Sequence, residues 1–432
     1  MIKKIPLQIQ ILLAILLGFF FALVHIHFGL DPSIKDYIKP IGTMFISSLK
    51  ASAVPLMVTS LIVGVTGVED SARLSRIGTK TFLMYTLTTI FSVTLGLLIG
   101  NIVRPGHFFS QMLQGSFAGA SLVGSTVEVN QHGWSETLVN LVPDNVFKAL
   151  SNNESLLQIV IISIIFAIAL LKIPQRKRKL IMMFCEGVND AFTEIIQMIM
   201  RLAPIGIFSL ISSLLLELSQ GDTVEILDYV YGLAWYTGTV FLSLSFMTFI
   251  VYPTWVTTFT KVTYGKFLEA MYPAQAVAFS TSSSSASLPV TTDRVEHFLG
   301  VPEDVSSFVL PIGATVNMDG TALYQGIATL FMAQAFGIEL SIQQQLVIVF
   351  YVTASSIGVA GVPGASIATT TMLLDILNIP VQGLILIMIP DRILDMCRTA
   401  TNITGDATVA VLVASWEGWL GKGKEELDIP QE

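Results

Sequence analysis

The chain has 432 residues, of which 53% are hydrophobic and only 12% are charged, and its mean hydropathy is +0.71. This composition is typical of a membrane protein, and the net charge of -8 argues against a nucleic-acid partner. The two cysteines, Cys185 and Cys397, lie in apolar surroundings, so neither a disulfide framework nor redox chemistry is expected.

Apolar stretches of spanning length dominate the first part of the chain. The amino-terminal run has the basic flank of a signal peptide, but it lacks a small-residue cleavage site and is long enough to span. We therefore expect it to be the first transmembrane helix. The expected spans are 6–27, 40–67, 80–103, 155–172, 182–216 and 229–253, with a partly embedded mixed segment from about 108 to 150.

The distribution of lysine and arginine predicts the orientation of these spans. Basic residues gather at the amino terminus, just before the span at 80–103, at 175–179 and at Lys261 and Lys266. The charged residues of the connection 217–228 are all acidic. Because basic loops remain in the cytoplasm, the amino terminus is expected on the cytoplasmic side.

Beyond residue 266 the apolar runs are interrupted by residues that break or hydrate a helix. A serine run ending in Pro289 interrupts 274–293, NMDG interrupts 308–337, and a Gly/Pro/Ser centre interrupts 346–377. The last span, around 390–406, is expected to be broken as well, which gives a twofold pattern. Paired interruptions at membrane depth indicate a secondary-transporter site, although the first and third could also be ordinary loops between spans.

Re-entrant hairpins at 274–293 and 346–377 fit the alternation of the connections. Each hairpin would enter and leave on one side of the membrane. The segment 292–304 and the carboxyl tail would then be cytoplasmic, and 337–345 would be outside.

The stretch PDRILDMCRTATNITGD, 390–406, places charges in the last span. Spacings of 4, 3, 4 and 4 put one narrow helical stripe through Asp391, Asp395, Arg398, Asn402 and Asp406, with Thr399 beside it. Arg392 is expected to face elsewhere. Three carboxylates against one guanidinium form a negative excess that needs a cation or protons. A structural ion-pair ladder or a solvated helix face is the alternative interpretation.

A fourth buried carboxylate, Asp319, lies in NMDGT, where Gly320 suggests an unwound turn. Free carbonyls, hydroxyls and a carboxylate would form an all-oxygen cage suited to a hard cation such as Na+. All five histidines lie at the ends of expected segments, so neither a histidine metal site nor a proton relay is visible. Tyr85, Thr88 and Thr89 form a polar cluster inside the third span, which taken alone is typical of contacts between helices.

Four motifs together closely resemble the dicarboxylate/amino acid:cation symporters, the bacterial and archaeal glutamate transporter homologues. They are STSSSSASLPVT, NMDGTALYQG, SSIGVAGVPGA and DRILDMCRTATNITGD, and the similarity covers nearly the whole chain. The resemblance implies an all-α polytopic membrane protein with eight transmembrane helices and two re-entrant helical hairpins, built from inverted repeats. It also implies a homotrimer in the plasma (inner) membrane, with both termini cytoplasmic, that works as an elevator-type transporter.

The resemblance further implies a division of the chain into a static scaffold and a moving transport domain. Residues 1–79 would form the first two scaffold helices, and 80–105 a third helix that belongs to the transport domain. The range 106–253 would hold the fourth and fifth scaffold helices and a sixth helix that moves with the transport domain. The transport core would be 254–420, and 421–432 would be a cytoplasmic tail.

For the substrate, the resemblance implies that Ser284 and Ser285 of the first hairpin and Val362 to Ser366 of the second close over it from opposite sides. Asp395 would hold its ammonium and Arg398 its side-chain carboxylate. The remaining polar groups would be bound by Thr321, Thr399 and Asn402.

Three Na+ sites are implied likewise, with no cofactor beyond the coupling ion. The first would use Asp406, Asn402 and the backbone of Gly313 and Asn317. The second would use Thr315 and the carbonyls of Ser356, Ile357 and Val359. The third would use Tyr85, Thr88, Thr89, Asn317 and Asp319.

The sequence departs from the family at positions that carry charge in relatives. Archaeal relatives have an arginine at Ser282 and animal relatives have one at Met396, so Arg392 is the candidate substitute. Gln325 stands where animal relatives carry a proton-linked glutamate, and counter-transport of K+ is therefore not expected.

We therefore expect a secondary active symporter, not an enzyme, that takes up acidic amino acids (aspartate or glutamate) with Na+. Proton coupling stays open, because a carboxylate can carry a proton as well as bind Na+. An intramembrane aspartyl protease would need the GxGD signature, which is missing, and a channel would need a ring of like groups. A C4-dicarboxylate carrier is the nearest rival, although Asp395 would repel a substrate without an ammonium.

Overall fold

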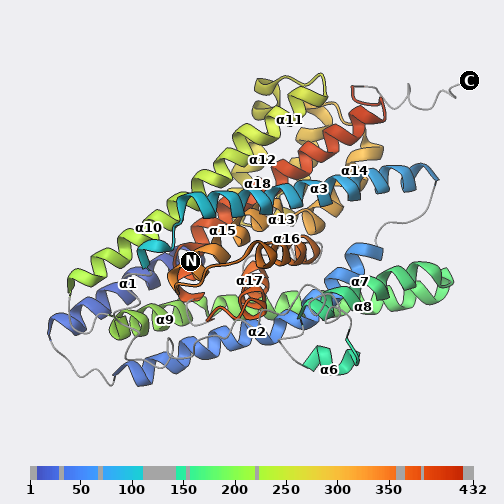
Figure 1. Cartoon of the computed structure of the whole chain (residues 1–432). Helices are drawn as coiled ribbons and strands as arrows, with labels where there is room; N and C mark the ends of the chain where they lie inside the picture. The colour runs from blue at the N-terminus through green and yellow to red at the C-terminus, as the bar shows by residue number, and fades with distance from the viewer. Residues whose placement is uncertain are drawn as a thin grey trace, which may run out of the picture.

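The computed structural model describes residues 7–28, 34–66, 72–109, 143–151, 156–218, 223–356, 365–380 and 384–421. Within these ranges every regular element is a helix, and long helices run roughly alongside one another in an elongated bundle (Figure 1). This agrees with the all-α class expected from the sequence. Most of the mixed segment expected at 108–150 lies outside the described residues.

The helices of the first part follow the apolar stretches. They are α1 (Leu7–His27), α2 (Ile34–Thr66), α3 (Ala72–Val103), α6 (Val146–Ser151), α7 (Leu156–Lys172), α8 (Gln175–Arg201), α9 (Ala203–Leu218) and α10 (Thr223–Phe246), which continues through the π-helix η2 (Met247–Val251) into α11 (Tyr252–Phe259). Leucine, isoleucine and alanine favour helix, and in a membrane the helix satisfies every internal backbone group.

The single span expected at 182–216 is instead two helices. α8 ends at Arg201 and α9 begins at Ala203, and the two are bent by 56°. Pro204 lies in the first turn of α9, where its missing N–H costs no hydrogen bond but its ring prevents α8 from continuing straight. The apolar period alone could not reveal this bend.

The second part contains the helices that carry the interruptions. They are α12 (Tyr264–Thr281), α13 (Ser284–Asp293), the π-helix η3 (Arg294–Phe298), α14 (Glu303–Val316), α15 (Asp319–Ala335), α16 (Ile342–Ser356), α17 (Ala365–Ile376) and α18 (Leu384–Trp416). Residues 357–364, at the centre of the third interrupted segment, lie outside the described residues.

The serine run ends one helix and starts the next, as expected. Ser282 adopts a left-handed backbone conformation with φ 52, and the hydroxyl of Ser283 accepts a hydrogen bond from the backbone N–H of Ala286 at 3.3 Å. Such an N-terminal cap starts α13, which packs against α12. The interruption predicted in this segment is therefore confirmed.

The NMDG segment also interrupts its span, but two residues before the glycine. Asn317 and Met318 separate α14 from α15, whereas Gly320 lies in the first turn of α15. A Cβ on Gly320 would lie 2.6 Å from the carbonyl oxygen of Arg398, so the glycine allows α15 and α18 to approach closely.

The last span is not broken, contrary to expectation. α18 is one helix of 33 residues, although Pro390 lies inside it. Acidic and basic residues three or four positions apart can pair on the surface of an intact helix, as Asp395 does with Arg392 and Arg398, so these charges pair without opening the backbone. α18 contacts α10 from the first part of the chain and α12, α14 and α15 from the second part, and so lies at the centre of these helices (Figure 1).

By length and composition, two helices of the described ranges could cross a membrane, Arg76–Val103 and Val230–Phe259. The bent pair α8 and α9 would be a third span. α18 carries four charged residues in its first half, and α12 to α17 are short or interrupted. Charges and interruptions of this kind lower the hydropathy of a helix or shorten it, so the spans predicted in this part of the chain stay predictions.

Candidate functional site

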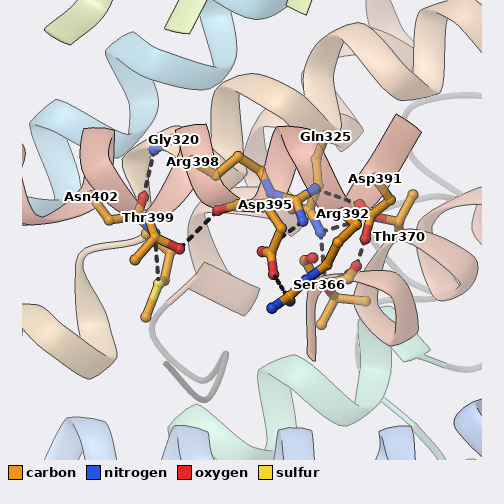
Figure 2. Close-up of polar contacts among 12 residues, drawn as sticks. Gly320, Gln325, Ser366, Thr370, Asp391, Arg392, Asp395, Arg398, Thr399 and Asn402 are labelled. Atoms are coloured by element: carbon orange, nitrogen blue, oxygen red, sulfur yellow. Dashed lines mark hydrogen bonds and ion pairs between the residues drawn. The ribbon is translucent and has the colours of Figure 1, made fainter. Parts of the chain in front are cut away.

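A pair of arginines and a pair of aspartates meet on the first half of α18. Arg398, only 1% exposed, donates through Nη1 to Asp391 Oδ1 at 2.9 Å and through Nη2 to Asp395 Oδ1 at 2.8 Å (Figure 2). Its guanidinium also lies over the ring of Tyr324, 4.0 Å from the ring centroid. The stripe predicted from the spacing therefore brings Asp391, Asp395 and Arg398 into direct contact.

The helical angle predicted that Arg392 faces away from the stripe of Asp391, Asp395 and Arg398. This prediction is wrong. Arg392 is 6% exposed, and its Nη1 lies 3.4 Å from Asp395 Oδ2. A long side chain three residues before Asp395 can reach sideways across the helix surface, which the position of a Cβ does not indicate. With Arg392 included, two aspartates and two arginines form a group of zero net charge.

The negative excess predicted for α18 lies instead between Asp406 and Asp319 of α15. Both are buried, at 2% and 0% exposure, and among the described residues neither forms an ion pair. Asp319 accepts hydrogen bonds from Thr89 at 2.8 Å and from the Tyr252 hydroxyl at 2.7 Å. Asp406 accepts one from Asn317 Nδ2 at 2.9 Å.

Neutral donors alone cannot balance two buried carboxylates. Removing an ionised carboxylate from water costs several kcal/mol even after relaxation, so a cation or protons must join this pair. Oxygen atoms surround the pair, as a hard cation such as Na+ requires. The two acids are therefore a candidate site for a cation or for protons, either of which would supply the missing positive charge.

Further oxygen atoms of the predicted cation sites come from α3 and α14. The Thr88 hydroxyl donates to Asn317 Oδ1 at 3.2 Å, and the Tyr85 hydroxyl donates to the carbonyl of Val309 at 2.9 Å. A Cβ on Gly313 would lie 2.5 Å from the Tyr85 hydroxyl and 2.6 Å from Asp406 Oδ1, which shows how closely these groups meet.

Sequence reasoning missed Tyr252 in this group. The residue follows η2, and an inserted π-turn rotates the helix after it. Its hydroxyl bonds to Asp319, 67 residues later in the chain. No spacing rule connects positions so far apart, but a tyrosine inside an apolar span was a signal that its hydroxyl would need a partner.

The other residues predicted to bind substrate come from α18, α15 and α13. Asn402 Oδ1 accepts from the backbone N–H of Gly320 at 2.8 Å, and its amide nitrogen lies 3.2 Å from Met318 Sδ (Figure 2). The Thr399 hydroxyl donates to the carbonyl of Asp395 at 2.8 Å. Thr321 and Ser284 are buried, whereas Ser285 is exposed.

Some buried polar atoms here have no hydrogen-bond partner among the described residues. They include Ser366 Oγ, Arg398 Nε and Arg392 Nε. Nearby, Gln325 Nε2 donates to the hydroxyl of Thr369 at 2.7 Å (Figure 2). Buried polar groups are rarely left unsatisfied, so unpaired atoms beside Asp395 fit a site that receives a polar ligand.

The second predicted cation site lies only partly within the described residues. Thr315 is exposed and donates to the carbonyl of Ile312 in its own helix at 3.0 Å. The Ser356 hydroxyl donates to the carbonyl of Thr353 at 2.9 Å. The other predicted ligands, Ile357 and Val359, and the predicted substrate contact Val362 lie outside the described residues.

Comparison with known proteins identifies the family. The sequence pattern of the sodium:dicarboxylate symporter family matches residues 7–416, which is nearly the whole chain. The chain belongs to this family. Its resemblance to the dicarboxylate/amino acid:cation symporters is thereby confirmed.

Three relatives illustrate the range of names within the family. The chain is 33% identical over 428 residues to a proton/sodium-glutamate symport protein of Bacillus subtilis, covering 99% of this chain and 96% of the relative. It is 31% identical over 422 residues to a proton/glutamate-aspartate symporter of Escherichia coli, covering 96% and 93%. It is also 31% identical over 431 residues to a C4-dicarboxylate transport protein of Cupriavidus pinatubonensis, covering 98% and 95%.

Membership makes the protein a membrane symporter and not an enzyme. The intramembrane protease considered from the sequence is thus ruled out. A symporter must bind a solute and a cation together. Among the described residues, one group of buried charges on α18 contains ion pairs, and the acids Asp319 of α15 and Asp406 of α18 accept hydrogen bonds from neutral donors.

Proposed function

We propose that this symporter takes up acidic amino acids, aspartate or glutamate, together with Na+. The observation that carries the proposal is the buried contact of Arg398 with Asp395, near two further acids whose partners within the described ranges are all neutral. A fork of guanidinium N–H groups matches a carboxylate, and a neighbouring carboxylate matches an ammonium. The names of the Bacillus subtilis and Escherichia coli relatives support the same substrate class.

Binding would proceed by exchange of partners. The side-chain carboxylate of the substrate would replace an aspartate on Arg398, and its ammonium would take the carboxylate of Asp395 that this exchange releases. Thr321, Thr399, Asn402, Ser366 and the serine run at Ser284 and Ser285 would supply the remaining hydrogen bonds. Exchange keeps Arg398 and Asp395 each paired with an opposite charge, while the backbone carboxylate of the substrate would depend on these hydrogen bonds.

Coupling would follow from residues shared between the two groups. Asn402 holds the backbone of Gly320 next to Asp319, and Asn317 contacts Asp406 while accepting from Thr88. A cation bound between Asp319 and Asp406 would fix the α14–α15 break and, through Asn402, the substrate face of α18. The substrate must then strengthen cation binding by the same factor.

The remaining features of the transporter belong to the same proposal. Eight transmembrane helices and two re-entrant hairpins would form each protomer of a homotrimer in the plasma membrane, with both termini in the cytoplasm. Helices of 1–79 and most of 106–253 would stay fixed, while 80–105 and 254–420 carry the substrate across as an elevator. The basic connections and the interruptions at Ser282 and Asn317 support this arrangement.

Two variants of this function have specific support. Proton coupling is supported by the names of the relatives, which include the proton alone or with sodium. Transport of C4-dicarboxylates is supported by the Cupriavidus relative and by Arg392, which offsets the charge of Asp395.

Uptake into liposomes tests the proposal. Purified protein would be given labelled aspartate, glutamate or succinate, with Na+ and proton gradients imposed separately. We expect aspartate or glutamate to accumulate against its gradient with Na+ alone. Accumulation with a proton gradient in Na+-free buffer would contradict Na+ coupling, and accumulation of succinate only would contradict the substrate class.

A further inference from the structure

Arg392 is a charged residue of this site that takes no part in the proposed exchange of partners between the substrate, Arg398 and Asp395. It is buried on α18, beside a small cavity lined by Ile11 of α1, Phe45 of α2, Met200 of α8 and Ile207 of α9. A guanidinium against such apolar side chains is costly and is retained mainly for a task.

The contacts of Arg392 indicate what this task involves. Its Nη1 lies 3.4 Å from Asp395 Oδ2, while Asp395 Oδ1 accepts from Arg398 Nη2 at 2.8 Å (Figure 2). Each oxygen of Asp395 thus faces a different arginine. A substrate carboxylate that draws Arg398 away would still leave Arg392 on the other oxygen.

Charge then distinguishes the substrates that this site could accept. Asp391, Arg392, Asp395 and Arg398 sum to zero. A C4-dicarboxylate adds two negative charges, an acidic amino acid adds one in net, and asparagine adds none. The attraction of Arg392 for a ligand scales with the ligand's net charge and is stronger inside a protein than in water.

We propose that Arg392 determines which substrate charge the site accepts. By offsetting the charge of Asp395, it allows the site to accept a dicarboxylate without an ammonium as well as an acidic amino acid. The inference rests on the proposed function, since it requires Arg398 and Asp395 to bind the substrate. Arg392 acts on specificity through the charge balance around Asp395.

Competition against uptake of labelled aspartate measures this effect. Unlabelled succinate, aspartate and asparagine compete in wild type, Arg392→Gln, Arg392→Met and Arg392→Lys under the same gradients. We expect Arg392→Gln and Arg392→Met to weaken succinate about tenfold more than aspartate, and aspartate more than asparagine. Arg392→Lys keeps the order of the wild type because it keeps the charge.

Two controls separate charge from structure. Arg201→Gln removes a positive charge from an exposed position at the end of α8 and should leave all three competitors unchanged. The double variant Arg392→Gln/Asp395→Asn removes one charge of each sign and should restore succinate relative to aspartate.

If Arg392 were purely structural, replacing it would weaken the binding of all three competitors by the same factor. That outcome in either charge-removing variant, or failure of millimolar succinate to compete in wild type, overturns the inference. Absence of aspartate uptake by the wild type under both gradients would instead contradict the proposed function.

Discussion

The buried acids of this protein differ in what neutralises them. Asp391 and Asp395 each contact arginine, whereas in the part of the chain that the structure describes Asp319 and Asp406 contact hydroxyl and amide donors and no cation. A paired acid can release its partner to a ligand and then receive another. A buried acid without an ion pair needs a bound cation or a proton to neutralise it. This difference is the reason for proposing that the first pair of acids binds the solute and the second pair binds the coupling ion.

Replacing Arg398 with cysteine tests the assignment of the solute. An acidic substrate would then bury an unpaired carboxylate, at a cost of about 3 to 5 kcal/mol. We expect Arg398→Cys to lose uptake of aspartate and glutamate and to gain weak binding of serine, alanine or cysteine. Asp395→Asn should instead weaken all amino acids alike, because each of them carries the ammonium.

A competition panel of acidic and neutral amino acids on both variants is the measurement. If Arg398→Cys kept its acidic preference with near-normal affinity, Arg398 would be structural, and Arg392 would become the candidate for the substrate carboxylate.

Replacing Asp406 with asparagine tests the assignment of the coupling ion. The amide keeps the size of the side chain but removes one of the two charges that have no cationic partner. We expect the Na+ concentration for half-maximal substrate binding to rise about tenfold or more, and saturating Na+ to recover much of the substrate affinity. A Na+ titration of substrate binding to purified protein measures both, and an unchanged Na+ dependence would contradict the assignment.

At the scale of helices, the site depends on two interruptions placed against one continuous helix. The breaks at Ser282–Ser283 and Asn317–Met318 bring short helix ends to α18, which runs unbroken past them. Irregular backbone then lies next to a rigid row of charged and amide side chains. Close contact between α15 and α18 at Gly320 holds this geometry together.

The variant Gly320→Ala should disturb this contact. Its Cβ would lie 2.6 Å from the carbonyl of Arg398 and 2.9 Å from the Thr401 Cβ, so the two helices must separate. Overpacking of this kind costs about 1 to 3 kcal/mol. We expect a lower unfolding temperature in detergent and weaker binding of both aspartate and Na+.

The matched control is Gly187→Ala on α8, where an added Cβ meets nothing within 4 Å. It should leave unfolding temperature and binding unchanged. Equal effects of the two substitutions would show that the approach of α15 to α18 does not matter for the site.

The sequence predicted those features that depend on neighbours along the chain. Serine and proline in an apolar run indicated the interruption at Ser282, and the regular spacing brought Asp391, Asp395 and Arg398 together. Features set by distant contacts were missed. The reach of Arg392 to Asp395 depends on a long side chain rather than on a helical angle, and the bond from Tyr252 to Asp319 joins two separate helices.

On the scale of the whole molecule, the helices form two groups with different chemistry. α1 and α2 pack with α7, α8 and α9, and their contacts are mainly apolar, whereas α3 and α10 to α18 gather the buried acids. Arg392 and its small cavity lie where the groups meet. A movement of one group along the other would therefore cross a mainly apolar surface with Asp391, Arg392 and Asp395 close to it, which is compatible with the proposed elevator mechanism.

The last prediction is that the two ends of the α14–α15 span lie on opposite sides of the membrane. The proposed topology places the connection before α14 in the cytoplasm and the connection before α16 outside, because the broken span between them crosses the membrane once. His297 in η3 and Gln343 in the first turn of α16 are exposed positions next to these connections. In a background with Cys185 and Cys397 replaced by alanine, His297→Cys should react with an impermeant thiol reagent only from inside, and Gln343→Cys only from outside. If one side labelled both positions in right-side-out and inverted vesicles alike, α14 and α15 would form a re-entrant pair, and the alternation of basic connections would not report the topology.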